Sequence, residues 1–209
     1  MVIPILLGSR NPARLEITRQ ARAGLPARLV SLDEVGVVED AIEDGVTAVE
    51  NARLKALFYY RAARLPTLAM DGALHIERFS EDKQPGVLVR RVNGRPEPRT
   101  DQELLRYYIA ELEAVGGESP ARWLAGYALA YPGVGGDEPR VLVEHFVFNV
   151  QLVAQPVGQV TPGHSLDPLM REPSSGRPYT EIPIQERPYF QTIRGFVERA
   201  LPDIKRGIA

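Results

Sequence analysis

The stretch GSRNPARLEI, residues 8–17, decides the fold, because it joins an apolar strand to a helix through a short loop. The apolar run before it predicts a buried strand over Val2–Leu7. Asn11 is typical of a helix start, since its side chain caps free amides and the proline that follows suits the first turn. The helix is predicted to run to about Ala23 and to precede a second strand over Ala27–Leu32. The order strand, helix, strand predicts a βαβ unit and an α/β fold.

The loop of this unit carries the polar residues Ser9, Arg10, Asn11 and Arg14. Two arginines at a helix N-terminus concentrate positive charge where the helix dipole already favours anions. The loop therefore predicts a binding site for a phosphate group. It is not a Walker P-loop, because the Gly-Lys-Ser/Thr ending is missing. The alternative interpretation is an ordinary capped helix with solvent-facing arginines.

A second helix is predicted after the acidic stretch EVGVVEDAIEDG, residues 34–45. Thr47 and Glu50 have the spacing of a capping box, and apolar residues recur at helical spacing up to Leu65. The remaining patterns predict a loop-rich segment over 78–100 and a helix over Asp101–Ala114. Antiparallel strands are predicted over Arg122–Tyr131 and Val141–Val153, joined by the turn PGVGGDEP (132–139). An amphipathic helix is predicted over Tyr189–Ile204.

The segment TLAM, residues 67–70, predicts a short strand that delivers Asp71 into a turn at Gly72. Ligands in open α/β sheets bind beyond the carboxyl ends of strands, so Asp71 and the arginine loop are expected at one edge of the sheet. Carboxylates from two segments beside bound phosphates suit Mg²⁺. The second carboxylate is expected from the acidic stretch, whose candidates are Glu39, Asp40, Glu43 and Asp44. The alternatives are an aspartate that caps its own turn and a solvated acidic loop.

Composition excludes several classes of function. The chain of 209 residues has 25 Lys and Arg against 27 Asp and Glu, and the net charge of -2 argues against nucleic acid or an anionic membrane as a partner. The absence of cysteine excludes disulfides, thiolate nucleophiles and Cys-ligated metals. His75, His145 and His164 fit no metal-binding spacing, although His164 lies near Asp167 in sequence. No run is long enough to span a bilayer and no signal peptide is recognisable, so we expect a cytoplasmic protein.

The order of these motifs resembles the inosine triphosphatase family, also called the Ham1-like or non-canonical purine NTP pyrophosphatases. Ser9, Asn11 and Arg14 match the family loop T-G-N-x-x-K, and the helix signature E-N-A-x-x-K-A stands intact as ENARLKA, residues 50–56. Further family segments are matched by AMDGAL (69–74), PGVLVRRVNG (85–94), ARWLAGYALA (121–130) and, more weakly, GHSLDP (163–168), ERP (186–188) and QTIR (191–194).

This chain departs from the family pattern at positions linked to function. Met70 replaces the first aspartate of A-D-D-S-G-L, and Gly72 and Ala73 replace its Ser-Gly. The aromatic pair of the base-binding G-F-G-Y-D-P is replaced within residues 164–166, and the histidine of the closing S-H-R is absent. The scaffold of the family is therefore kept while the pocket for the base is altered.

The resemblance implies a single domain over residues 1–209, with a long twisted mixed β-sheet flanked by helices in two lobes and a central cleft. It also implies Mg²⁺-dependent hydrolysis of a nucleoside triphosphate to the monophosphate and pyrophosphate, by a homodimer. Asp71 would bind the metal and orient or deprotonate the attacking water, with Glu43 as the favoured second carboxylate. The residues that would bind substrate are Ser9, Arg10, Asn11, Arg14, Lys55, Gly72, Asp167, Arg187 and Arg194.

Two alternatives stay open at this point. The loop also resembles the S-x-S-P-R-R start of the Maf-like nucleotide pyrophosphatases, although the ENARLKA helix argues against that group. The second alternative is a nucleotide-binding or regulatory descendant that kept the phosphate site and lost turnover, and Met70 and Gly72 favour it.

Overall fold

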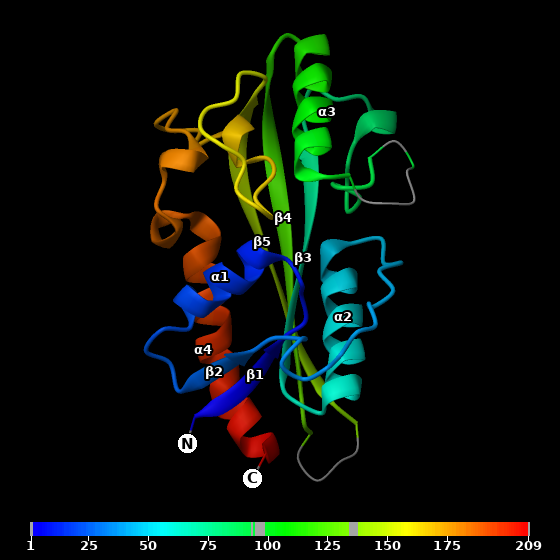
Figure 1. Ribbon diagram of the computed structural model, residues 1–209, viewed down its shortest axis with the longest axis vertical. Coiled ribbons are helices and arrows are strands. Elements are labelled where there is room, and N and C mark those ends of the chain that lie inside the picture. The colour runs from blue at the N-terminus through cyan, green and yellow to red at the C-terminus, as the bar shows by residue number, and fades with distance from the viewer. Residues whose placement is uncertain (1, 93, 95–98, 134–137, 209) are drawn as a thin grey trace. The chain divides into compact units, whose positions relative to one another are not determined.

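The computed structural model describes residues 2–92, 94, 99–133 and 138–208, and its elements follow the predicted order (Figure 1). Parts of the predicted turn (134–137) and of the predicted loop (93 and 95–98) lie outside these residues. The helices and strands are β1 (Ile3–Leu7), α1 (Pro12–Ala21), β2 (Ala27–Val30), α2 (Ala48–Ala63), β3 (Thr67–Ile76), α3 (Asp101–Ala114), β4 (Glu118–Tyr131), β5 (Arg140–Val153), β6 (Met170–Arg171) and α4 (Pro188–Ile208). Short 3₁₀ helices lie at η1 (Glu81–Lys83), η2 (Asp167–Leu169), η3 (Tyr179–Glu181) and η4 (Ile184–Glu186).

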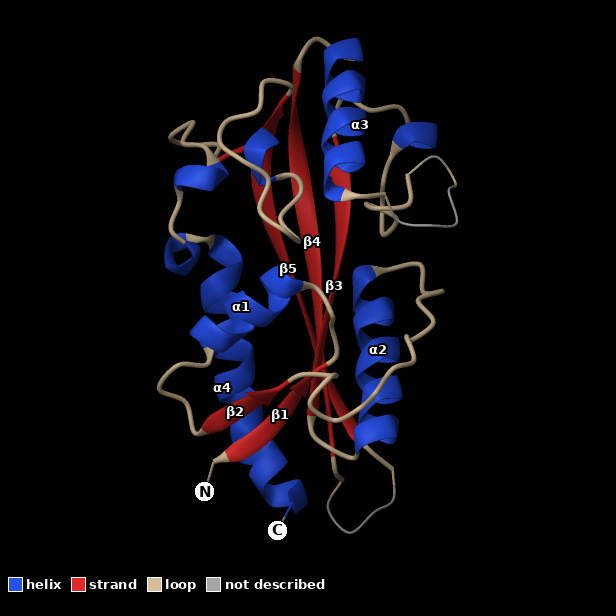
Figure 2. Ribbon diagram, in the orientation of Figure 1, coloured by secondary structure: helices blue, strands red, loops and turns tan. Residues whose placement is uncertain are grey.

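The strands form one open mixed sheet in the order β2-β1-β3-β4-β5-β6, drawn in red in Figure 2. β1 pairs in parallel with both β2 and β3, while β5 and β6 are antiparallel. The parallel pair β1 and β2 joined through α1 confirms the predicted βαβ unit. The structure therefore confirms the α/β fold with a mixed sheet, and places the predicted strand pair β4 and β5 side by side in it.

The chain divides into two compact units. Unit 1 contains residues 1–71, 125–146 and 188–209, and unit 2 contains residues 72–124 and 147–187. The strands β3, β4 and β5 each contribute residues to both units. The single-domain organisation and the cleft between two lobes stay predictions.

The core of unit 1 depends on a close approach between α2 and β4. Small residues on these two elements and on β3, together with Tyr60, form one buried cluster: Ala52, Ala56, Ala69, Ala128 and Ala130. Gly126 of β4 lies so close to α2 that a Cβ atom there would be 2.4 Å from the carbonyl oxygen of Ala48. Thr47 caps this end of α2 and forms the predicted capping box with Glu50. Small side chains and a side-chain cap thus fix where α2 begins on the sheet.

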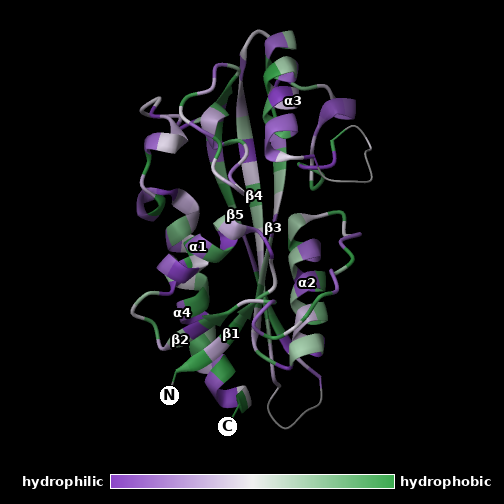
Figure 3. Cartoon of the chain, in the orientation of Figure 1, coloured by the Kyte–Doolittle hydropathy of each residue, from purple (hydrophilic) through white to green (hydrophobic). Residues whose placement is uncertain are grey.

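Helix α4 is amphipathic, as its sequence pattern predicts, and it packs beside α1 in unit 1. Its buried residues recur at helical spacing: Phe190, Ile193, Phe196, Val197, Ala200, Leu201 and Ile204. Apolar and polar residues alternate along α4 in Figure 3, consistent with one buried and one exposed face. Phe196 contacts the ring of Tyr127 in β4, with the ring centroids 5.8 Å apart. α4 therefore covers the sheet as well as α1.

Unit 2 has its own buried centre around α3. Thr100 and Glu103 form a capping box at the start of this helix, and Leu104, Tyr108 and Leu112 form its buried face. The Tyr108 hydroxyl donates a hydrogen bond to the carbonyl of Val89, and burial raises the pKa of this side chain strongly. The helix predicted from Asp101 to Ala114 is confirmed at both ends.

The short strand and turn predicted around Asp71 are wrong. β3 runs through Asp71 and Gly72 to Ile76 instead of ending at Met70. The reason is that Leu74 and Ile76 continue an alternating apolar pattern and are 1% and 0% exposed, so burial keeps the chain extended despite the glycine. The Leu74 and Gly86 backbones also exchange two hydrogen bonds, which hold this half of the strand. Asp71 thus lies in the middle of a strand and not beyond its carboxyl end.

Among the residues that the structure describes, no helix combines the length and the apolar character needed to cross a membrane.

Candidate active site

The loop after β1 is closed by its own side chains. Asn11 accepts hydrogen bonds from the backbone amides of Ala13 (2.8 Å) and Arg14 (3.3 Å), as predicted for the N-cap of α1. The Asn11 amide in turn donates to the Ser9 hydroxyl (3.2 Å), and the Gly8 amide donates to the carbonyl of Leu68 in β3. The loop is therefore fixed beside β3, the strand that carries Asp71.

Arg14 joins this loop to the acid of β3. Its Nη1 donates to the Met70 carbonyl at 3.0 Å, and its Nη2 lies 3.9 Å from Oδ1 of Asp71. The turn expected at Gly72 is absent. The arginine loop and Asp71 meet because β1 and β3 are neighbouring parallel strands. The predicted proximity of the basic loop and Asp71 is confirmed for Arg14.

Lys55 connects Asp71 to the acidic stretch. The Nζ atom of Lys55 donates to Asp71 Oδ1 at 2.8 Å and to Glu43 Oε2 at 3.1 Å. Lys55 and Asp71 are 4% and 8% exposed, whereas the Glu43 side chain is 34% exposed. A buried ammonium and a buried carboxylate require each other, because either charge alone would lose its hydration without compensation. We refer to Arg14, Glu43, Lys55 and Asp71 as the Asp71 cluster.

One oxygen of Asp71 has spare capacity. Oδ2 is buried and has no hydrogen-bond partner among the described residues, while Oδ1 is held by Lys55. A buried carboxylate oxygen normally accepts a hydrogen bond or binds a cation. Asp71 therefore has an acceptor available for a ligand.

The cluster fits a magnesium ion in its chemistry. Mg²⁺ prefers one or two carboxylates and completes its coordination with water and substrate phosphates, and Glu43 and Asp71 offer such a pair. The described residues contain no group of three or more acidic, histidine or cysteine side chains that could hold a metal by themselves. The Glu39 and Asp40 side chains are not in contact with Lys55 in the described interactions, so the geometry favours Glu43 as the second carboxylate.

Arg10 binds the residues after β2, and its described contacts include no member of the Asp71 cluster. Its guanidinium donates to the Val37 carbonyl at 2.9 Å and to the Glu39 carbonyl at 3.4 Å. It also pairs with Asp40 through Nε (3.1 Å) and with Asp33 through Nη1 (3.4 Å). The structure thus does not bring Arg10 together with Arg14, although they lie in one loop.

Asp167 and Arg187 form a second buried ion pair, in unit 2. Arg187 Nη1 donates to Asp167 Oδ2 at 2.6 Å, and the same guanidinium donates to the carbonyls of Tyr179 and Ile182. His164 Nδ1 lies 3.5 Å from Asp167 Oδ2. Burial raises the pKa of Tyr179 to about 12 beside this pair. These contacts give both residues a structural role, and their contact with substrate stays a prediction.

Arg194 and Gly72 complete the predicted set. Arg194 donates from Nη1 to the carbonyls of Ala21 and Ala23, so it lies at the C-terminal end of α1, opposite the end that Asn11 caps. Ten helical residues separate these ends by about 15 Å, and the structure therefore does not bring Arg194 to the Asp71 cluster. Gly72 follows Asp71 in β3, where a Cβ atom would be 3.5 Å from the ring of Trp123.

Two polar residues that sequence reasoning passed over position the acidic stretch. The Tyr59 hydroxyl accepts a hydrogen bond from the Ala41 amide, and Asn51 accepts one from the Gly45 amide. The signal for Asn51 was present, because it lies inside the ENARLKA motif with Lys55. Tyr59 follows Lys55 by one helical turn, which places both on the face of α2 toward the stretch.

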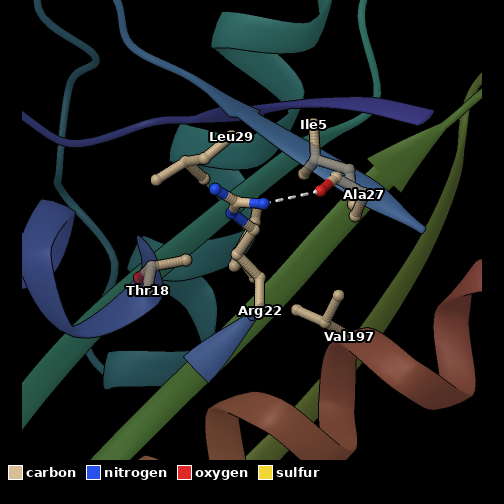
Figure 4. A pocket seen from close by; sticks show the side chains of 7 residues that line it. Ile5, Thr18, Arg22, Ala27, Leu29 and Val197 are labelled. Atoms are coloured by element: carbon tan, nitrogen blue, oxygen red, sulfur yellow. Dashed lines mark hydrogen bonds between the residues drawn. The ribbon is translucent and has the colours of Figure 1, made fainter. Parts of the chain in front are cut away.

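A small cavity in unit 1 lies away from the predicted site residues, none of which lines it (Figure 4). Apolar side chains including Ile5, Leu29 and Val197 form most of its wall. Arg22 reaches into it and donates to the Ala27 carbonyl at 3.2 Å. We interpret it as a packing defect between β1, β2 and the helices, and not as a substrate site.

Comparisons with known proteins agree with these motifs. Residues 5–191 match the family model described as the Ham1 family. The chain is 30% identical over 198 residues to a dITP/XTP pyrophosphatase of Thermus thermophilus, covering 94% of this chain and 89% of that protein. It is 31% identical over 183 residues to a dITP/XTP pyrophosphatase of Nitrosomonas europaea, covering 88% and 85%. The solved structure of a HAM1 protein from Coxiella burnetii superposes with a TM-score of 0.73 at 27% identity, covering 96% of this chain and 99% of that chain.

Proposed function

The chain belongs to the Ham1 family, and from that premise we propose that it hydrolyses a non-canonical purine nucleoside triphosphate to the monophosphate and pyrophosphate. The names of the relatives support the class of reaction, since those proteins are called dITP/XTP pyrophosphatases. The observation that carries the proposal is the Asp71 cluster, in which a buried carboxylate with a free oxygen lies between two cations. This arrangement suits hydrolysis of a polyphosphate, which needs positive charge beside the phosphates and a group that accepts a proton from the attacking water.

The triphosphate would be bound by the cationic side of the cluster. Arg14 is one-third exposed and lies in the first turn of α1, where the helix dipole also favours a phosphate. Lys55 is shared between two carboxylates, and its ammonium is able to exchange one of them for a phosphate oxygen. Both cations would stabilise the negative charge that builds on the phosphate oxygens in the transition state.

Asp71 would act on the attacking water. Its free Oδ2 accepts a hydrogen bond from the water and orients it toward the α-phosphorus, while Lys55 fixes the carboxylate through Oδ1. The water oxygen forms a bond to the α-phosphorus, the bond to the bridging oxygen of the β-phosphate breaks, and pyrophosphate leaves. Asp71 accepts the proton of the water and releases it to solvent.

Glu43 and Asp71 are the residues that would hold Mg²⁺. When bound, the ion supplies charge stabilisation to the phosphate oxygens. Met70 does not contribute a ligand, because its side chain is buried and uncharged and its carbonyl accepts a hydrogen bond from Arg14.

The test is the release of pyrophosphate from ITP, XTP, dITP and the standard triphosphates in the presence of Mg²⁺. We expect release from a non-canonical purine triphosphate and a loss of about 10³-fold in kcat for Asp71→Asn, because the amide cannot accept the proton. Asp203→Asn is the matched control, since this carboxylate of unit 1 pairs with Arg206 near the chain's end and is expected to leave kcat unchanged. Equal rates for Asp71→Asn and the wild type would contradict the proposal.

A second candidate function rests on Met70. The family motif has two adjacent acids, and here one is replaced by a buried methionine, which reduces the negative charge available to a metal. A protein that binds nucleotides without turnover is the second candidate. Saturable binding of ITP with no pyrophosphate release from any triphosphate supports this candidate and excludes the first.

We also propose that the protein is a cytoplasmic homodimer without nucleic-acid or membrane partners. The family resemblance supports the dimer, and the net charge of -2 argues against polyanionic partners. Light scattering after size exclusion tests the dimer, and a mass near 23.2 kDa would exclude it.

A further inference from the structure

The residues between β2 and α2 that carry Glu43 are only partly held by packing. We define them as the acidic segment, residues 33–46. Three of its large apolar side chains are exposed to solvent: Val38 (78%), Ile42 (78%) and Val46 (82%). Val37 is buried in a cluster with Leu6 and Tyr59, and the partly buried Val35 and Ala41 pack against that cluster. Since exposed apolar groups contribute little to folding, the position of the residues around Val38, Ile42 and Val46 depends largely on polar contacts.

Arg10 makes four polar contacts to the first half of this segment. It binds two backbone carbonyls and two carboxylates, which uses all three nitrogens of the guanidinium. The fork of an arginine suits such a set of acceptors, and a lysine ammonium could not span it. Asp33 and Asp40 are 93% and 77% exposed, so their ion pairs are individually weak, and the bond to the part-buried Val37 carbonyl anchors the group.

The second half of the segment is held from α2. Tyr59 contacts Ala41 and Asp40, Lys55 binds Glu43, and Asn51 binds the Gly45 amide. Asp40 is the junction, because its Oδ1 accepts from both Arg10 and Tyr59. A displacement at Arg10 would therefore pass through Asp40 to the residues that hold Glu43.

We propose that Arg10 is a positioning residue, which holds the acidic segment so that Glu43 stays at the Lys55–Asp71 pair, and that it is not a ligand of the triphosphate. This replaces the role that the sequence suggested for Arg10. The family loop T-G-N-x-x-K has glycine at this position, so the contact is a feature of this chain. The kinetic consequence of this inference rests on the proposed function. The contact by which Arg10 holds the acidic segment, which we call the tether, does not depend on catalysis.

Amide hydrogen exchange of the substrate-free protein tests the tether. Arg10→Met is expected to raise exchange at residues 37–46 at least tenfold and to leave α1 unchanged. Arg10→Lys is expected to behave similarly, because it keeps the charge and loses the fork. Arg199→Met is the matched control, since Arg199 is another exposed arginine of unit 1 and pairs with Glu144, outside the acidic segment. Unchanged exchange in Arg10→Met would overturn the proposal whether or not the protein is an enzyme.

Kinetics separate positioning from substrate binding. A positioning role predicts that Arg10→Met and Asp40→Ala each lower kcat about fivefold to twentyfold, change KM less than twofold, and combine non-additively in the double variant. A phosphate ligand predicts the opposite pattern, in which Arg10→Met raises KM tenfold while Asp40→Ala, which frees the guanidinium, lowers it. If the wild type releases no pyrophosphate, the proposed function fails and the exchange data alone decide the tether.

Discussion

The two buried ion pairs of this protein differ in what they leave unsatisfied. Lys55 and Asp71 in unit 1, and Arg187 and Asp167 in unit 2, are all less than 10% exposed. The Arg187 guanidinium donates hydrogen bonds to one carboxylate and two backbone carbonyls. Asp71 keeps an oxygen without a partner among the described residues, and Lys55 is divided between two acids. Burial of charge therefore does not distinguish a site from a structural element here, whereas spare hydrogen-bonding capacity does.

The largest effect on stability is expected in the closed pair. Arg187→Met leaves Asp167 buried without its charge partner and removes two bonds to carbonyls, so we expect a loss of about 3–5 kcal/mol in the free energy of unfolding. Urea denaturation measures it, and 10 mM Mg²⁺ is expected to restore none of it. Arg177→Met, which breaks an exposed pair with Glu186, is the control and is expected to cost less than about 1 kcal/mol. A loss below this control value in Arg187→Met would remove the basis for calling the pair structural.

The Asp71 cluster is expected to respond differently to the same kind of change. Lys55→Met leaves Glu43 and Asp71 without their shared cation, and we expect a loss of about 3 kcal/mol, at the lower end of the range because Glu43 is partly exposed. Mg²⁺ is expected to raise the Tm of this variant by more than it raises the Tm of the wild type. In the variant both carboxylates are available to the ion, and a ligand that binds only the folded state stabilises it. A Tm of Lys55→Met that is insensitive to Mg²⁺ would show that the two carboxylates do not form a cation site.

The smallest effect on stability is expected at Glu172, whose carboxylate is exposed and not buried like those of the two ion pairs. Glu172 accepts hydrogen bonds from the side chains and the backbone amides of Ser174 and Ser175, which lower its pKa to about 2. Because the pKa is lower in the folded state than in the unfolded chain, the unfolded state binds more protons between these values. The stabilisation is complete above about pH 4.5 and is lost as the pH falls toward 2.

The measurement compares the wild type with Glu172→Gln by thermal denaturation. The Tm difference between the two proteins is expected to be small at pH 6 and to shrink further at pH 3. A difference that grows as the pH falls would contradict the sign of this pKa shift.

Local patterns predicted the elements of the fold well. The asparagine cap at Asn11 and the capping box at Thr47 are short-range features, and each marks the start of a helix in the structure. The parallel pairing of β1 with β3 brings Arg14 to Asp71. Their proximity could be expected from sequence because both segments were predicted to follow strands at the same edge of one sheet.

The errors arose where a distant contact outweighs a local signal. Gly72 is a turn residue by local rules, but burial of Leu74 and Ile76 keeps β3 extended through it. Arg10 is adjacent to the phosphate loop in sequence, but its acceptors lie 23 to 30 residues further along the chain. Arg194 likewise binds carbonyls more than 170 residues away. Such partners are set by the assembled sheet, and no spacing in the sequence records them.

Gly126 places a limit on how the protein can be engineered. Glycines within strands are common targets for replacement by alanine, because the change reduces the disorder of the unfolded chain. At this position the added methyl would meet the Ala48 carbonyl at 2.4 Å and push the start of α2 outward. Lys55 lies two turns along that helix, so the ammonium would move with it. Gly126→Ala, although chosen to stabilise the fold, would thus displace the Lys55 ammonium in the same unit.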